Sequence, residues 1–139
     1  MTQPGETAKV LIAEGPGMST EIRDSLSRYE IISVRTFDEA QRALAQDSFK
    51  LILIDLQFEE SRMVELLEHL RSHGSHQGVP IVCVQGTDRR VSSSIRLNMS
   101  RAVRALGGKA FFDLHAAEEM TAQTCEYLRQ ILTFPSNTL

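Results

Sequence analysis

The amino-acid sequence predicts one α/β domain, in which a parallel five-stranded sheet carries helices on both faces. Short apolar runs alternate five times with segments whose apolar residues recur at helical spacing. The runs are almost uninterrupted and are flanked by polar residues, which is typical of strands that are covered on both sides. At 139 residues the chain is long enough for a single core and requires no second domain.

The first predicted strand covers residues 9–13 and ends in the glycine- and proline-containing loop at 14–17. A helix follows, because apolar residues recur there at i, i+4 and i+7, and Ser19 or Thr20 is suited to cap its first turn. Residues 31–37 show partial alternation of apolar and polar side chains and are predicted to form the second strand.

The second helix is predicted to begin at Asp38, which forms a capping box with Gln41 three residues later. Next comes the central strand, in which four consecutive aliphatic residues lead directly to Asp55. A third helix begins near Met63 and is ended by Gly74. Asp55 is therefore expected at the carboxyl end of the strand, the edge at which ligands and chemistry collect in open α/β sheets.

The last third of the chain repeats the same alternation. Residues 79–84 are predicted to be the fourth strand, 88–106 the fourth helix, 109–114 the fifth strand and about 116–134 the last helix. Five strands joined by helices imply right-handed crossovers and a parallel sheet.

Composition and charge limit the class of protein. A formal net charge of −3 disfavours polyanions, which argues against nucleic acid as a partner. The two cysteines, Cys83 and Cys125, form no disulfide framework, which favours a reducing cytoplasm. No apolar run approaches the ~20 residues that a membrane span requires, and the amino terminus lacks a targeting pattern. We therefore expect a cytoplasmic protein with no membrane attachment.

Four of the apolar runs, together with the position of Asp55 at the end of one of them, resemble the strands of a known family. Over about residues 8–134 the chain resembles the receiver domain of two-component response regulators. The resemblance implies a flavodoxin-like fold with sheet order 2-1-3-4-5 and a role in a signal-transduction phosphorelay with a histidine kinase. The matching runs are residues 10–13, 51–55, 80–84 and 107–112.

The resemblance implies that Asp55 occupies the phosphoacceptor position. In the family an aspartate attacks phosphorus while Mg²⁺ and a lysine neutralise the transferring oxygens. The acidic pair that helps to hold Mg²⁺ falls on Glu14 and Gly15, so one carboxylate remains. A weak Mg²⁺ site at Glu14 and Asp55, or no cofactor at all, is therefore expected.

Other positions of the family site also differ in this sequence. The hydroxyl residue after the fourth strand aligns with Gln85, with Thr87 a poorer substitute, and the lysine of the fifth strand aligns with Leu114. The switch aromatic falls on Phe111, and the segment that begins at Gln57 lacks the motifs that follow the acceptor in the family. Only Asp55 of the usual set is intact.

These positions predict an atypical receiver whose phosphorylation site has eroded and which acts through protein-protein interaction, with no catalytic residues and no enzymatic activity. One alternative is a conventional receiver that is phosphorylated on Asp55 with the help of Mg²⁺. Another, from a different class, is a doubly wound domain that binds a flavin or nucleotide, or acts as an enzyme, through the loop at residues 14–19.

The fourth helix is predicted to be an interaction face. The stretch between Gln85 and Gly107 is about seven residues longer than the family usually has, which implies an extended helix. One side of this helix is apolar and the opposite side is basic, which suits an acidic partner or a second copy of the chain through acidic residues near the third helix. The basic side comprises Arg89, Arg90, Arg96, Arg101 and Arg104.

Three histidines, His69, His73 and His76, follow one another near the end of the third helix. A metal site is conceivable, but imidazoles are also favoured at a helix carboxyl terminus by the dipole, and we adopt this second interpretation.

Overall fold

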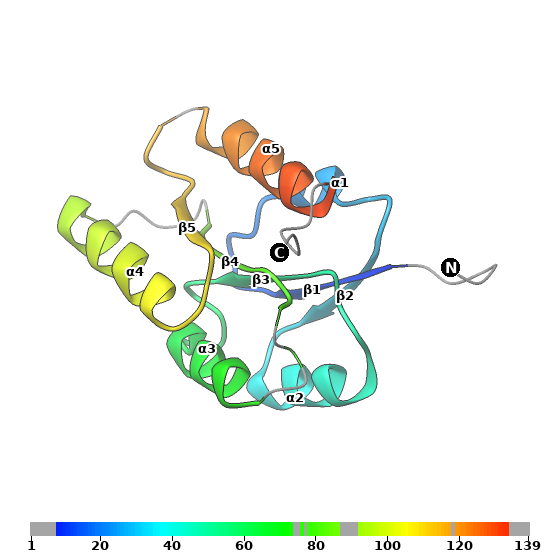
Figure 1. Cartoon of the computed structure of the whole chain (residues 1–139). Coiled ribbons are helices and arrows are strands. Elements are labelled where there is room, and N and C mark those ends of the chain that lie inside the picture. The colour runs from blue at the N-terminus through cyan, green and yellow to red at the C-terminus, as the bar shows by residue number, and fades with distance from the viewer. Residues whose placement is uncertain (1–7, 74–75, 77, 87–91, 118, 134–139) are drawn as a thin grey trace.

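The computed structural model of the chain contains the predicted parallel sheet (Figure 1). It describes residues 8–73, 76, 78–86, 92–117 and 119–133. Every strand is parallel to its neighbours, and the order is β2-β1-β3-β4-β5, as the resemblance implied. The strands are β1 (Lys9–Ala13), β2 (Glu30–Val34), β3 (Leu51–Asp55), β4 (Ile81–Gln85) and β5 (Ala110–Asp113).

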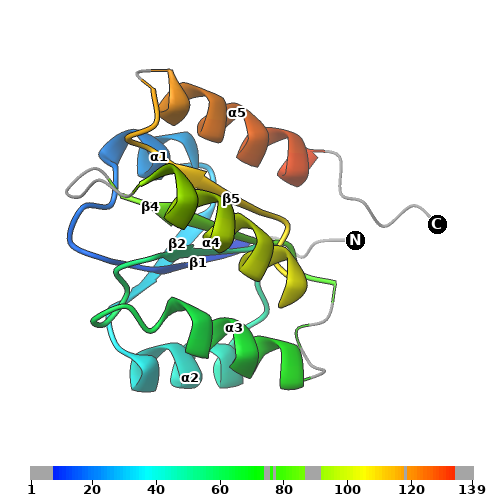
Figure 2. The ribbon, with the colours of Figure 1, turned by 90° about the vertical axis from the view of Figure 1, so that its left-hand side faces the viewer.

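Helices cover both faces of the sheet. Figures 1 and 2 show α1 and α5 on one face, α2 and α3 on the other, and α4 beside β5. The helices are α1 (Thr20–Ser25), α2 (Phe37–Gln46), α3 (Met63–Ser72), α4 (Ser93–Ala105) and α5 (Met120–Thr133). None of these described helices is long and apolar enough to cross a membrane.

The strands divide the core into two layers because successive side chains point to opposite faces. In β3, Ile52 and Ile54 join the core beneath α2 and α3, whereas Leu51 and Leu53 join the core beneath α1 and α5. All four side chains are fully buried, and each contributes roughly 1.5–3 kcal/mol of hydrophobic stabilisation. The central strand is thus fixed on both sides, and its last residue is held rigidly at the sheet edge.

The helix caps confirm one prediction and correct another. Ser19 caps α1, accepting a hydrogen bond from the Ile22 amide at 3.4 Å. The second helix begins at Phe37 rather than after Asp38, because the N-cap is Thr36, whose hydroxyl accepts from the Glu39 amide at 3.1 Å. The prediction failed because two overlapping stretches both fit a capping pattern, and the one two residues upstream is used. This early start also ends β2 at Val34 instead of residue 37.

The fourth helix begins at Ser93, not at residue 88. Ser92 is its N-cap, with extended backbone angles (φ −70°, ψ 163°), and its hydroxyl accepts from the Ile95 amide at 3.2 Å. Residues 87–91, which include Thr87, Arg89 and Arg90, lie outside the described residues.

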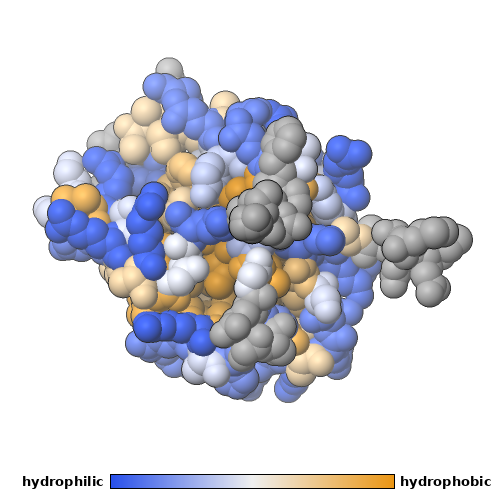
Figure 3. Space-filling model, viewed as in Figure 1, coloured by the Kyte–Doolittle hydropathy of each residue, from blue (hydrophilic) through white to orange (hydrophobic). Residues whose placement is uncertain are grey.

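The outer surface of α4 is both apolar and basic. Ile95 is 47% exposed and Leu97 is 51% exposed. Figure 3 shows apolar side chains among hydrophilic ones over the amino-terminal end of this helix. Only Val103 of α4 is fully buried, so the helix rests on the domain through a narrow strip of side chains.

Candidate functional site

Asp55 is the last residue of β3 and lies at the carboxyl edge of the sheet, opposite Val84 of β4. Its side chain is fully buried, with 0% exposure. Its Oδ1 atom accepts a hydrogen bond from the Gln57 amide at 2.7 Å. This contact, two residues along the chain, is the local turn interaction that aspartate commonly makes.

Two glycines close over the Asp55 carboxylate. A Cβ atom placed on Gly15 would lie 2.6 Å from Asp55 Oδ1, and one placed on Gly86 would lie 2.8 Å from Asp55 Oδ2. The Gly86 Cβ would also lie 2.5 Å from the carbonyl oxygen of Gly17. The loops after β1 and β4 therefore pack against the carboxylate through backbone atoms, and this packing excludes water from it.

The glutamine predicted to replace the family's hydroxyl residue lies beside Asp55. Gln85 ends β4 and is 0% exposed. Its Oε1 atom accepts from Gln57 Nε2 at 3.5 Å, and its Nε2 atom donates to the Gly86 carbonyl at 3.4 Å. Both contacts are long and therefore weak. The contact between Gln57 and Gln85 brings two neutral amides together at the sheet edge where Asp55 ends β3.

Glu14, the remaining acid of the predicted metal pair, is engaged elsewhere. Its carboxylate forms an ion pair with Arg23 of α1, and its side chain is only 10% exposed. A cation at this carboxylate would have to compete with a guanidinium that is already in place.

The residues present do not fit a conventional magnesium site. Mg²⁺ requires near-octahedral oxygen ligands at short distances. Gly15 offers no side chain, Glu14 is paired with Arg23, and Asp55 Oδ1 is hydrogen-bonded to a backbone amide. Among the described residues, no three histidine, cysteine, aspartate or glutamate side chains are grouped to hold a metal ion. His69 lies in the last turns of α3, His73 is the C-cap of that helix, and His76 lies in the turn before β4.

Leu114 directly follows β5 and is 6% exposed. It joins the core beneath α1 and α5 together with Leu51 and Leu53, the face to which strand alternation also directs Asp55. Asp113, one residue earlier, pairs in register with Gln85 and is almost completely buried. Its Oδ2 atom accepts from Arg96 Nη1 at 3.2 Å, and its Oδ1 atom accepts from the His115 amide at 3.0 Å.

Asp113 and Arg96 thus form an ion pair at the carboxyl edge of the sheet. The sequence analysis did not predict this pair: it did not single out Asp113, and it assigned Arg96 to the basic side of the fourth helix. The signal was present: Asp113 follows an apolar run just as Asp55 does, and it lies on the same side of its strand as Phe111. Phe111, the predicted switch aromatic, is 9% exposed and belongs to the core layer that contains Val103 of α4.

The loop after β3 has an unusual backbone. Glu59, Glu60 and Ser61 all have positive φ angles, of 37°, 56° and 70°. Left-handed backbone disfavours residues with a Cβ by roughly 1–2 kcal/mol each, so other contacts must hold this loop.

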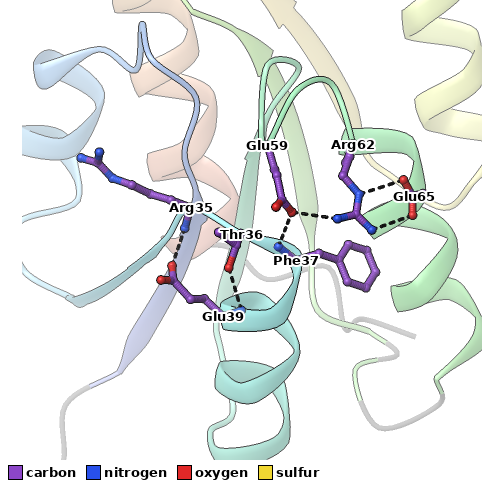
Figure 4. A network of polar contacts seen from close by, with 7 residues as sticks. All are labelled: Arg35, Thr36, Phe37, Glu39, Glu59, Arg62 and Glu65. Carbon is purple, nitrogen blue, oxygen red and sulfur yellow. Dashed lines mark hydrogen bonds and ion pairs between the residues drawn. The ribbon is translucent and has the colours of Figure 1, made fainter.

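Figure 4 shows the contacts that hold it. The Glu59 carboxylate accepts from the Phe37 amide at the start of α2 at 2.7 Å and from Arg62 Nη1 at 2.9 Å. Arg62 also makes two hydrogen bonds of 2.9 Å to Glu65, and its guanidinium carbon lies 4.7 Å from the centre of the Phe37 ring. The loop is therefore tied to α2 and α3 by charge-assisted hydrogen bonds.

A cleft of about 360 Å³ opens beside this loop, next to the buried Asp55. Three of its side chains are carboxylates and one is an arginine, which gives it an acidic character. The lining residues are Glu14, Gly15, Pro16, Met18, Arg35, Gln57, Glu59 and Glu60.

No protein-family model and no curated protein sequence matches the chain. Solved structures do match it. The phosphorylated cyanobacterial phytochrome response regulator RcpA is 17% identical, with a TM-score of 0.73, and the match covers 95% of this chain and 98% of that one. A response regulator from Hahella chejuensis is 19% identical, with a TM-score of 0.73 and coverage of 96% and 100%.

A third similar structure is the Mn²⁺-bound form of a response regulator, 15% identical, with a TM-score of 0.67 and coverage of 96% and 99%. At these identities the similarity establishes the fold. The chain therefore has the CheY-like flavodoxin fold of response regulator receiver domains, as the sequence predicted.

Proposed function

We propose that this chain is a receiver-like signalling domain that acts through protein contacts and does not depend on phosphorylation of Asp55. The observation that carries the proposal is the enclosure of Asp55, which is 0% exposed beneath Gly15 and Gly86. We expect neither enzymatic turnover nor a tightly bound cofactor.

The surroundings of Asp55 are poorly suited to phosphoryl transfer. A carboxylate oxygen must reach phosphorus in line with the leaving group while cations stabilise the transferring oxygens. Here a Cβ atom placed on Gly15 would lie 2.6 Å from Oδ1. The adjoining cleft is lined by three carboxylates and one arginine, and two of the carboxylates already engage arginines, so it offers little positive charge to an anionic donor. Loss of one preorganised electrostatic stabiliser commonly costs about 10²–10³ in rate, and both the lysine and one metal-binding acid are replaced.

The α4 surface is the proposed contact face for a signalling partner. This helix carries Arg96, Arg101 and Arg104 and no acidic residue, although the whole chain is net negative. Its exposed Ile95 and Leu97 add apolar area that a partner can bury. The proposed partner is thus an acidic protein surface with apolar side chains, and a second copy of the chain is one way to supply it.

A conventional phosphoacceptor is the second candidate function. The position of Asp55 at the end of β3, in a fold shared with a structure described as a phosphorylated response regulator, supports it. Opening of the loops over Asp55 and weak Mg²⁺ binding at Glu14 and Asp55 would both be required. The small-ligand alternative stays a prediction, to be checked by the absorbance and nucleotide content of the purified protein.

The deciding experiment is incubation with Mg²⁺ and a small phosphodonor such as acetyl phosphate, followed by intact-mass spectrometry at several times. We expect no stoichiometric adduct of one phosphoryl group, because the carboxylate is enclosed and its stabilising cations are replaced. Asp55→Asn is the matched control, since it keeps the size of the side chain and removes the nucleophile.

A prompt adduct in the wild type that is absent from Asp55→Asn would overturn the proposal and support the conventional receiver. An adduct that forms equally in both proteins would identify a different acceptor and leave Asp55 without a phosphoryl-accepting role, as proposed.

A further inference from the structure

Two adjoining clefts lie at the amino-terminal edge of the sheet, at the far end of the strands from Asp55. Their volumes are about 590 Å³ and 210 Å³, and they share walls at Gly78, Val79 and Gly107. In Figure 2 the last turns of α3 and α4, which border the clefts, lie on the same side of the molecule as the last turn of α5. We call the two together the basic cleft.

The ionisable residues of the basic cleft come from four different segments. Two are contributed by the last turns of α3 and α4, one by the turn before β4 and one by the residue before β5. No described residue that lines either part is acidic, although acids outnumber bases in the chain. The ionisable residues are Arg71, His76, Arg104 and Lys109.

The two arginines of the cleft are not neutralised within the described part of the chain. Arg62, the N-cap of α3, and Arg96 of α4 form ion pairs with acidic side chains. Arg71 and Arg104 form no ion pair with any residue that the structure describes. A concave surface with one sign of charge concentrates counter-ions of the opposite sign.

Helix dipoles account for only part of this arrangement. Cations near a helix carboxyl terminus offset its partial negative charge, which explains some preference for Arg71 and Arg104. The last carbonyls of α4, however, already accept bonds from the amides of Leu106, Gly107 and Gly108. Lys109 precedes a strand and terminates no helix.

The walls of the cleft leave room for a ligand. Gly78 and Gly107 have positive φ angles, and a Cβ atom built on either would meet nothing within 4 Å. Tyr127 of α5 lines the larger part of the cleft. Cationic side chains from separate elements beside a polar aromatic ring suit a multiply charged anion with several oxygen acceptors.

We propose that the basic cleft binds a phosphate-bearing small molecule, held by Arg71, Arg104 and Lys109. The site is distinct from Asp55 and does not depend on the function proposed above, because the two lie at opposite edges of the sheet.

The test is a titration of the full chain with pyrophosphate and with ATP without metal, followed by amide NMR shifts and calorimetry at constant ionic strength. Sodium chloride at matched ionic strength controls for bulk salt. Arg104→Gln combined with Lys109→Gln removes two cleft charges. Arg28→Gln combined with Arg42→Gln is the control, because both residues are exposed and lie away from the cleft, in the turn after α1 and in α2, and the pair changes the net charge equally.

We expect saturable binding with shifts centred on Gly107, Gly108 and Tyr127, weakened at least about tenfold in the cleft variant and less than about twofold in the control. Tighter binding of ATP than of pyrophosphate would assign a nucleotide, and equal binding would assign a polyphosphate; both support the proposal. Equal weakening in the two variants, scattered shifts, or no binding beyond that of chloride would overturn it. Melting temperatures of both variants check that each remains folded.

Discussion

At the scale of single residues, Gly15 determines the environment of Asp55. The resemblance identifies Gly15 as the position of a lost acid. Because glycine has no side chain, the loop backbone can pack directly onto the carboxylate: a Cβ atom at this position would lie 2.6 Å from Asp55 Oδ1. The second acid cannot simply be put back by substitution, because its Cβ would overlap Asp55 and its charge would repel it.

Gly15→Ala is therefore expected to destabilise the domain by ~1–3 kcal/mol, the usual cost of overpacking. The cost should be smaller in an Asp55→Ala background, where the crowded atoms are removed, although Gln57 Cβ stays 2.9 Å from the added methyl group. Urea unfolding of the four proteins of this double-mutant cycle measures both values. An equal cost in the two backgrounds would show that the Gly15 contact with Asp55 is not the cause.

Single residues also show which features of the site could not be predicted from the sequence. Leu114 lies in the core beneath α1 and α5, whereas Asp113, one residue earlier, is bound to Arg96, a contact that the sequence did not indicate. Apolar runs predict that a strand exists, but they do not fix which residue ends it. Contacts between distant segments, such as Glu59 with the Phe37 amide, have no local pattern and could not be predicted.

At the scale of elements, the strands were predictable and the helix ends less so. Fully buried strands such as β3 and β4 leave a strong apolar signal, and their order followed from the resemblance. Helix starts depend on caps, and the many serines and threonines of the chain offer several candidate caps. The N-caps of α2 and α4 are Thr36 and Ser92, so these helices begin at other residues than the predicted Asp38 and residue 88.

The junction of α4 with β5 depends on the Arg96–Asp113 pair. The Asp113 side chain is 1% exposed and the Arg96 side chain is 36% exposed. Removing the cation leaves a buried carboxylate without its charge partner, so Arg96→Ala should cost ~1–3 kcal/mol. Asp113→Asn should cost less, because it removes the buried charge and returns the arginine to solvent.

Denaturant unfolding measures the two costs, and hydrogen exchange of α4 amides locates them. Exchange should accelerate in α4 in both variants, because the helix has few other buried contacts. Arg101→Ala, which removes an exposed arginine of the same helix, is the matched control. If Asp113→Asn proves more harmful than Arg96→Ala, the hydrogen bond to the His115 amide, rather than the ion pair, holds this corner.

At the scale of the whole molecule, charge is separated along the strands. The carboxyl edge gathers Asp55, Asp113 and the carboxylates of the cleft beside Glu59, whereas the amino edge carries the basic cleft. The net charge of −3 hides this separation, which is why composition alone favoured no anionic ligand. The two edges are thus expected to attract ligands of opposite charge.

The stability of the molecule should also depend on pH through His69. Partial burial, followed by the nearby His73 and His76, lowers the pKa of His69. Its ring packs against Phe37 of α2, with 5.5 Å between ring centres, so the neutral form is part of the contact between α2 and α3. Because the folded-state pKa is lower than the unfolded value of ~6.5, the unfolded chain binds more protons as the pH falls through that value. The free energy of unfolding should therefore decrease from pH 7.5 towards pH 5.5.

Urea unfolding at several pH values measures this slope in the wild type and in His69→Gln, which keeps a polar side chain of similar length but cannot titrate. The slope should be reduced in His69→Gln, and His73→Gln should reduce it less, because it removes only one of the charges that oppose protonation of His69. A slope that is unchanged in His69→Gln would assign the pH dependence to other groups. In that case the α2–α3 contact would be insensitive to protonation, and its stability would rest on packing and on the Glu59 network alone.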